Sequence, residues 1–179
     1  MALTSTLLRF QIKLSDVDRG IYETLELRVP QHPSESETFL LTRVIAYALN
    51  TQDGIEWSGG IGTPDEAAIY VKDLTGQILL WIDIGNPSAR RLHKASKASK
   101  AVRIYTYRDP QILFDEVTGQ EIYKSDSIEI FSLKQKFLDA LAETLNRDNA
   151  WELLHTEGEL SITTKKATIQ GEIQKHSIV

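Results

Sequence analysis

Residues 64–85, PDEAAIYVKDLTGQILLWIDIG, contain two apolar runs joined by a short polar turn at residues 73–76. β-Branched and aromatic residues are frequent in both runs, which predicts a strand on each side of the turn and hence a hairpin. The second run is apolar at five successive positions, 78–82, a pattern typical of a central strand buried on both faces. We therefore expect this hairpin to place a strand in the middle of a sheet.

The sequence that follows the hairpin alternates between helix and strand. Residues 88–98, SARRLHKASKA, are rich in helix formers and begin with Ser88, which is placed to cap a helix. Residues 101–107, AVRIYTY, return to a strand pattern. The order strand, helix, strand over residues 78–107 predicts a right-handed crossover and a parallel pair of strands.

Both ends of the chain are predicted to contribute antiparallel strands. Residues 4–20 and 22–30 should form a hairpin, and residues 149–179 alternate through two or three strands with a turn at Gly158. The elements expected between them are helices at 35–51, 109–119 and 133–146 and strands near Trp57 and at 128–133. The fold class is therefore α/β, with a mixed central sheet flanked by helices and antiparallel strands at both chain ends.

The composition limits the class of protein. A chain of 179 residues with 41% hydrophobic content can bury one core, so a single domain over residues 1–179 is expected. There is no cysteine, which excludes disulfides, thiolate metal sites and a cysteine nucleophile and fits a reducing cytosol. Because the N-terminal stretch lacks an export signal and no apolar run is long enough to span a bilayer, we expect a cytoplasmic protein away from membranes.

The basic residues are unevenly distributed. The net charge is −5, yet residues 85–108 carry seven basic and no acidic side chains, whereas the rest of the chain has 13 basic and 25 acidic ones. This distribution predicts a basic surface on the helix at 88–98, which would meet the phosphates of a nucleic acid. The plainer alternative is a solvated cationic helix face without a ligand.

Two acids lie at the same end of the predicted hairpin. Glu66 precedes the first strand, and Asp83 follows the apolar run of the second, where a carboxylate is desolvated and costly unless a cation meets it. Carboxylates that converge there would hold Mg²⁺, or Mn²⁺ in its place, and activate a water molecule toward a phosphodiester. The alternative is that both acids are only the polar ends of two strands.

Several short motifs of the chain are distinctive: HPSE at 32–35, Arg43, PDEA at 64–67, WIDIGNP at 81–87 and ARRLHKA at 89–95. Together they resemble the signature of the YaeQ family of bacterial proteins. The resemblance covers essentially the whole chain and implies a single YaeQ-like domain. It also implies a variation on the PD-(D/E)XK nuclease fold, which is restriction-endonuclease-like. In that fold one strand carries an acid and the next carries an acid followed two residues later by lysine. It implies no established activity.

The resemblance implies roles for the acids. Glu66, preferred over the adjacent Asp65, matches the first acid and Asp83 the second, so both are expected to hold the metal. Gly85 stands where the lysine that positions or activates the attacking water is expected. We expect Lys94, on the helix that follows, to supply this cation as the third catalytic residue.

Further residues are expected to support this site. The phosphate contacts on the helix at 88–98 are assigned to Arg90, Arg91 and Lys97. Glu35, at the start of the first helix, would ligate the metal or, with Ser34, support its ligands. Ser34 or Ser36 would cap the helix. Arg43 is expected to bind substrate together with the basic residues of the helix at 88–98. It would clamp Glu35 or Asp83 within the site, or else form a surface ion pair of little stability.

Two classes of function follow from these residues. The first is a metal-dependent nuclease or phosphodiesterase that acts on nucleic acid. The second is a regulator that binds nucleic acid or protein and keeps the fold without the chemistry, because Gly85 replaces the lysine. A third role, in binding a small ligand or a protein, would belong to the Gly-rich loop at 59–62.

Overall fold

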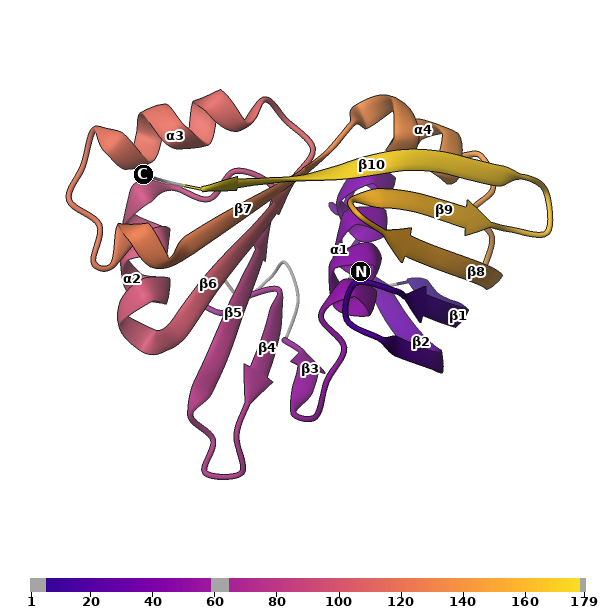
Figure 1. Ribbon diagram of the computed structural model, residues 1–179, viewed down its shortest axis with the longest axis horizontal. Coiled ribbons are helices and arrows are strands. Elements are labelled where there is room, and N and C mark those ends of the chain that lie inside the picture. The colour runs from indigo at the N-terminus through magenta and orange to yellow at the C-terminus, as the bar shows by residue number, and fades with distance from the viewer. Residues whose placement is uncertain (1–5, 59–64, 178–179) are drawn as a thin grey trace. The chain divides into compact units, whose positions relative to one another are not determined.

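A computed structural model describes residues 6–58 and 65–177, and the chain divides into two compact units (Figure 1). The first unit comprises residues 1–49 and 133–173, and the second comprises residues 50–132 and 174–179. The single domain expected over residues 1–179 stays a prediction. The Gly-rich loop at 59–62 and Pro64 lie outside the described residues.

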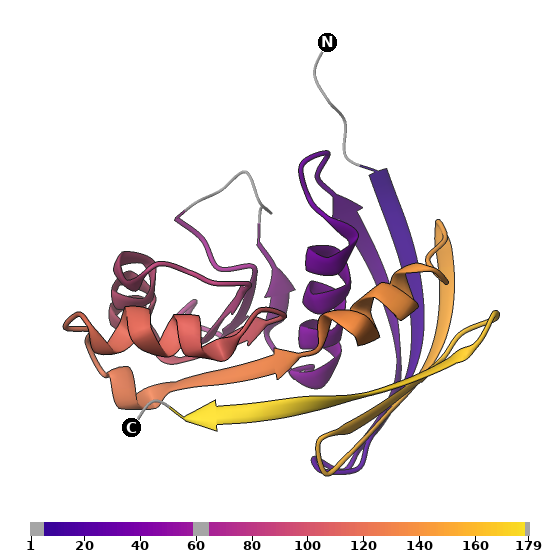
Figure 2. The same ribbon diagram turned by 90° about the horizontal axis from the view of Figure 1, so that it is seen from above.

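The first unit is a sheet with helices on one face. Its strands, in the order in which they lie side by side, are β2 (Ile21–Gln31), β1 (Thr6–Asp16), β8 (Asp148–Thr156), β9 (Glu159–Thr163) and the first part of β10 (Thr168–Ser177). Its helices are α1 (Glu37–Leu49) and α4 (Gln135–Ala142). Figure 2 shows both helices on the same face of this sheet. The hairpin of β1 and β2 and the antiparallel C-terminal strands confirm the predictions for the chain ends.

Packing on that face follows the alternation of the sequence. Every second side chain of β1 is buried, and Phe10 lies edge-on to Trp151 of β8 with 5.0 Å between ring centroids. At Gly171 a side chain would meet the ring of Phe137 from α4, so glycine lets the helix approach β10 closely. Strand β1 also pairs in parallel with β8, which joins the two ends of the chain. The sequence did not predict this pairing, because local patterns do not say which hairpins meet.

The second unit is a mixed sheet with two helices on one face. Its strands, again in spatial order, are the last part of β10, β7 (Ile128–Leu133), β6 (Ser99–Thr106), β5 (Ile78–Ile84), β4 (Ile69–Lys72) and β3 (Ile55–Trp57). The remaining elements are α2 (Ala89–Ala98), α3 (Pro110–Thr118) and the short 3₁₀ helix η1 (Ser125–Ser127). Strands β5, β6 and β7 are parallel, whereas β3, β4 and β5 are antiparallel.

These elements confirm the predicted α/β class and the secondary structure predicted over residues 65–107. The β4–β5 hairpin, the Ser88 cap of α2 and the parallel β5–β6 pair all form as expected. Trp81 of β5, Leu92 of α2 and Leu113 of α3 share one buried cluster, which fixes both helices on the sheet. Within the described ranges, no helix is long and apolar enough to cross a bilayer.

Candidate functional site

The site forms where β4 begins and β5 ends. Tyr70 lies opposite Trp81 in the antiparallel pair, and the N–H of Ala68 donates to the carbonyl of Ile82 at 3.0 Å. Glu66 precedes Ala68 by two residues, so it lies at the end of the hairpin that carries Asp83. The structure therefore brings the two predicted acids to the same end of neighbouring strands, beside the start of α2.

Asp83 is buried and is held by an arginine. Its side chain is 3% exposed, and Arg91 of α2 binds both of its oxygens, with Nε 2.8 Å from Oδ2 and Nη2 2.9 Å from Oδ1. Such a bidentate pair is among the stronger polar contacts in proteins. Because a buried carboxylate is costly without a partner, Arg91 is the group that stabilises Asp83 in this position.

Arg91 makes further contacts that fix its position. Nη2 also donates to the backbone carbonyl of Glu66, and the guanidinium carbon lies 5.9 Å from the ring centroid of Trp81, a cation–π geometry. The hydroxyl of Ser88 caps α2 by accepting from the N–H of Arg91, so the start of the helix sets the direction of this side chain. Hydrogen bonding to Asp83 raises the pKa of Arg91 despite the opposing effect of burial, and the group stays charged.

Lys94 lies one turn further along α2 and meets a different acid. Its Nζ is 2.7 Å from Oδ1 of Asp65, and both side chains are largely exposed. The hydrogen bond from Lys94 and its charge lower the pKa of Asp65. Sequence reasoning preferred Glu66 over Asp65 and did not find this pair. Residues 65 and 66 lie in a turn before β4, so no local pattern in the sequence indicates which of the two acids meets Lys94.

Tyr70 of β4 lies within the electrostatic influence of both predicted acids. Burial raises the pKa of Tyr70, and the negative charges of Glu66 and Asp83 raise it further. The Tyr70 hydroxyl also accepts a hydrogen bond from the N–H of Ala67 at 3.0 Å. Glu66 thus belongs to the cluster through its backbone carbonyl, which meets Arg91, and through the effect of its charge on Tyr70.

Gly85 replaces the expected lysine for a reason that the backbone shows. Its φ is +87°, in the left-handed region that side-chain-bearing residues rarely adopt. The nearest atom to a side chain built there is the hydroxyl of Tyr107 at 3.9 Å, so space is available and the obstacle is the backbone conformation. The turn that leads from β5 to α2 therefore favours glycine where the predicted site would need lysine.

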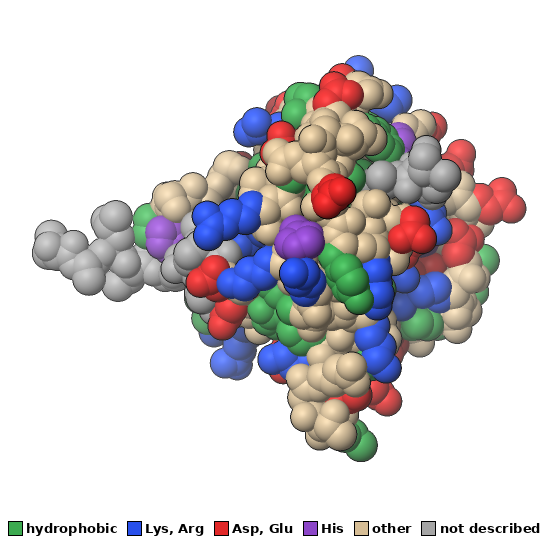
Figure 3. Space-filling model, turned by 90° about the vertical axis from the view of Figure 1, so that its left-hand side faces the viewer, with side chains coloured by type: hydrophobic (Ala, Val, Ile, Leu, Met, Phe, Trp, Pro, Cys, Tyr) green, Lys and Arg blue, Asp and Glu red, His purple; other side chains and the backbone are tan. Residues whose placement is uncertain are grey.

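The exposed face of α2 is basic. Arg90, Lys94 and Lys97 are exposed and follow one another at intervals of four and three residues, which places them along one side of the helix. Figure 3, which views the side of the molecule that carries α2 and α3, shows a band of Lys and Arg side chains with acidic ones around it. Arg91, predicted for this row, instead turns inward to Asp83.

The sequence of the chain matches a family model and curated relatives. The family model described as YaeQ protein matches residues 1–173. The chain belongs to the YaeQ family. Over 107 residues it is 28% identical to the uncharacterized protein YaeQ of Escherichia coli K12 and 27% identical to that of Salmonella typhi. Each match covers 60% of this chain and 59% of the length of the relative.

Solved YaeQ structures share the fold over nearly the whole chain. The YaeQ protein from Xanthomonas axonopodis pv. citri matches with a TM-score of 0.89 and 25% identity, covering 98% of this chain and all of the other. The YaeQ protein from Pseudomonas syringae matches with a TM-score of 0.88 and 27% identity, covering 97% and 96% of the two chains. The expected membership in the YaeQ family is confirmed.

The other residues predicted for the YaeQ site form a separate group in the first unit. Arg43 binds both oxygens of Glu35 at 3.1 Å and the carbonyl of Pro30 at 2.9 Å, and both charged side chains are buried. Burial raises the pKa of Glu35 and lowers that of Arg43, in each case against the attraction of the partner. Of the roles expected for Arg43, the structure shows the clamp on Glu35, and the pair is not a surface one.

Ser34, one of the two serines expected to cap the first helix, does not do so. Ser36 caps α1 instead, with its hydroxyl accepting from the N–H of Phe39 at 3.1 Å. The Ser34 hydroxyl lies 2.7 Å from Nδ1 of His32, which also accepts from the Ser34 N–H. Nδ1 of His32 already accepts a hydrogen bond from the backbone N–H of Ser34. The two residues therefore form a local turn in the segment HPSE, and this contact does not make Ser34 an activated nucleophile.

The magnesium site predicted at Glu66 and Asp83 stays a prediction, and Arg91 is the group that the structure shows on Asp83. Mg²⁺ needs octahedral oxygen ligands and keeps several waters, whereas Asp83 is buried and bound through both oxygens. Among residues 6–58 and 65–177, no three His, Asp or Glu side chains form a group that could hold a metal ion. Of the two predicted ligands, Asp83 forms an ion pair with Arg91, and Glu66 contacts the same arginine through its backbone carbonyl.

Proposed function

We propose that this chain binds the phosphate backbone of a nucleic acid through the exposed basic row of α2 and does not hydrolyse it. The observation that carries the proposal is the bidentate contact of Arg91 with Asp83, which neutralises the acid that a nuclease would use. A carboxylate held in this way keeps α2 on the sheet. The basic row is thereby presented to solvent in a fixed orientation.

We infer that the second unit carries the variation on the PD-(D/E)XK fold that the family resemblance implies. Its support is the placement of Asp65, Glu66 and Asp83 at one end of two adjacent strands, with α2 following directly. The lysine of that fold is replaced by Gly85 in a left-handed conformation. The chain therefore keeps the phosphate-facing side of such a site while it lacks the group that positions the attacking water.

The charges of α2 suit contact with phosphates. Arg90 and Lys97 are exposed cations on the same side of the helix, with Lys94 between them. The Lys94–Asp65 pair is exposed, and such pairs contribute little stability. A phosphate oxygen, which forms a charge-assisted hydrogen bond with an ammonium group, would replace Asp65 at low cost.

A second candidate is a Mg²⁺- or Mn²⁺-dependent nuclease at Glu66, Asp83 and Lys94. One observation favours it: two acids and two cations, Asp65 and Asp83 with Lys94 and Arg91, occupy one end of the β4–β5 hairpin. For this function Arg91 would have to leave Asp83 when substrate arrives.

The binding experiment measures fluorescence anisotropy of labelled single-stranded DNA, duplex DNA and RNA at several salt concentrations, with EDTA present. The variant Arg90→Ala/Lys94→Ala/Lys97→Ala should weaken binding and reduce the slope of log K against log salt by about 0.7 to 0.9 per lost phosphate contact. The matched control, Lys134→Ala/Lys136→Ala/Lys166→Ala, removes the same charge from exposed positions of the first unit. Equal loss in both variants would reject the basic row as the binding surface.

A cleavage experiment separates the two candidates. The wild-type chain is incubated with the same substrates and Mg²⁺ or Mn²⁺, beside Asp83→Asn and Asp65→Asn. The proposal expects no cleavage above background in any of them. Cleavage by the wild-type chain that disappears in Asp83→Asn would replace the proposal with the nuclease function.

A further inference from the structure

We propose that Arg91 is the resident cation of the acid cluster, in the place where a divalent ion would otherwise bind. Its guanidinium group reaches three oxygen atoms: Nε donates to Oδ2 of Asp83, and Nη2 donates to Oδ1 of Asp83 and to the carbonyl of Glu66. A carboxylate and a backbone carbonyl are the ligand types that hard divalent ions take. The guanidinium group therefore lies among the oxygens that a metal ion would need, and the cluster is complete without one.

Arg91 and a divalent ion cannot occupy Asp83 together, because both are positively charged. Asp83 and Arg91 form a neutral pair in which the carboxylate is buried and the guanidinium group is partly exposed. A divalent ion on the same carboxylate would lie about 4 Å from the guanidinium group, a distance at which like charges beside a buried carboxylate repel strongly. A metal ion can occupy Asp83 only if Arg91 leaves.

Arg91 is anchored from both ends. Its backbone N–H is bonded to the Ser88 cap, and its guanidinium group lies against Trp81 as well as Asp83. Lys94, by contrast, forms an ion pair that is exposed to solvent. The anchoring distinguishes Arg91 from a surface cation that happens to face an acid.

Removal of Arg91 should therefore create a divalent-ion site. In Arg91→Ala the oxygens of Asp83 and the Glu66 carbonyl would face a water-filled gap, with Asp65 and the Glu66 side chain close by in the chain. The matched control is Arg90→Ala, which removes the same side chain from the adjacent, exposed position of α2. The inference rests on the contacts of Arg91 and not on nucleic-acid binding, so the two can fail separately.

The experiment measures binding of Mn²⁺ by electron paramagnetic resonance and the melting temperature with EDTA or Mn²⁺. Wild type and Arg90→Ala should show no Mn²⁺ site at the cluster and no change in melting temperature. Arg91→Ala should bind one Mn²⁺ and melt about 5 °C higher when free Mn²⁺ exceeds its dissociation constant roughly 100-fold. Arg91→Ala/Asp83→Asn should lose both effects.

Two results would overturn the inference. One is a Mn²⁺ site in the wild-type chain that Asp83→Asn removes, since metal and Arg91 would then coexist. The other is a folded Arg91→Ala that binds no Mn²⁺. If Arg91→Ala does not fold, Arg91→Gln takes its place, because its amide still donates to Asp83 without a charge, and a folded Arg91→Gln without a Mn²⁺ site counts equally against the inference.

Discussion

Two arginine–carboxylate pairs, one in each unit, are built alike but differ in their access to water. In the first unit Arg43 binds both oxygens of Glu35 and a backbone carbonyl. In the second unit Arg91 does the same with Asp83. The side chains of the first pair are 4% and 2% exposed, whereas Arg91 is 27% exposed above a 3% exposed Asp83. Both pairs make the same set of contacts, but the pair in the first unit is closed to water and the pair in the second unit is open to water on one side.

The pKa directions show what this difference means. Burial dominates in the first pair, since it raises the pKa of Glu35 and lowers that of Arg43. In the second pair the hydrogen bond to Asp83 dominates and raises the pKa of Arg91. The first pair therefore orders a buried segment at a cost in desolvation. The second holds its charge beside an exposed basic helix, where a ligand can reach it.

The largest predicted effect is on the closed pair. Arg43→Met leaves Glu35 buried without its counter-ion, so we expect a loss of about 3–5 kcal/mol in the free energy of unfolding. Urea unfolding followed by circular dichroism measures it. The double variant Glu35→Leu/Arg43→Met removes both charges and should be more stable than Arg43→Met alone. A single variant within about 1 kcal/mol of wild type would show that the pair behaves as a surface contact.

The open pair should be less sensitive. In Asp83→Asn the uncompensated Arg91 can turn toward water, so we expect a loss of about 2–3 kcal/mol in the same unfolding measurement. Arg91→Lys tests the geometry, because one ammonium group cannot reproduce the two parallel bonds of a guanidinium group. If Asp83→Asn costs as much as Arg43→Met, access to water does not separate the two pairs.

The sequence predicted the elements around the site better than the contacts within it. The apolar run of β5, the Ser88 cap and the β-branched and aromatic residues of β4 are local patterns, and each predicted its element correctly. The parallel pairing of β1 with β8 depends on residues far apart in the chain, and no local pattern carries it.

The choice of partners within the site also lay beyond local patterns. Arg91 and Lys94 have similar charge and lie one turn apart, yet the first meets buried Asp83 and the second meets exposed Asp65. Which cation turns inward depends on the rotation of α2 about its axis, and that rotation is set by packing of residues such as Leu92 against the sheet. The roles predicted for Glu66, Asp83 and Lys94 in catalysis stay predictions.

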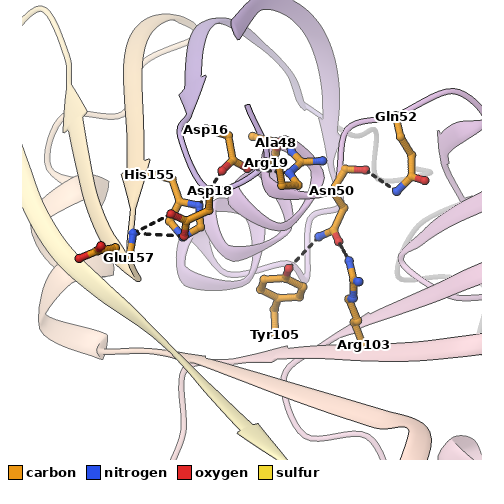
Figure 4. A network of polar contacts seen from close by, with 10 residues as sticks. All are labelled: Asp16, Asp18, Arg19, Ala48, Asn50, Gln52, Arg103, Tyr105, His155 and Glu157. Carbon is orange, nitrogen blue, oxygen red and sulfur yellow. Dashed lines mark hydrogen bonds and ion pairs between the residues drawn. The ribbon is translucent and has the colours of Figure 1, made fainter. Parts of the chain in front are cut away.

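A third pair, in the first unit, has nearly the same exposure as the open pair. Arg19 is 30% exposed and its Nε lies 2.7 Å from Oδ2 of Asp16, which is 1% exposed (Figure 4). The other oxygen of Asp16 lies 3.0 Å from Nδ1 of His155. Burial raises the pKa of Asp16, but hydrogen bonds and charges from Arg19 and His155 outweigh it, so the net pKa is lowered.

This pair predicts a dependence of stability on pH. Because the folded carboxyl group binds its proton less tightly than the unfolded one, the stabilisation is present above the unfolded pKa of about 3.8 and is lost as the pH falls through the folded pKa. Asp16→Asn should cost about 1–2 kcal/mol at neutral pH and should lose less of its remaining stability in acid than wild type. The urea midpoint across acidic pH measures both, and parallel profiles of the two proteins would exclude Asp16 as the source.

The smallest effect on stability is expected at the exposed pair of Lys94 and Asp65, and there binding is the better readout. Asp65→Asn should leave unfolding unchanged, because both side chains are solvated, and should raise affinity for nucleic acid about twofold to fivefold at low salt by removing a competitor for Lys94. Asp126→Asn removes an exposed acid of the same unit and controls for net charge. If the affinity for nucleic acid rises equally in both variants, Lys94 acts only through the overall positive charge of the surface. Arg91 would then be the cation of α2 whose specific partner matters for the site.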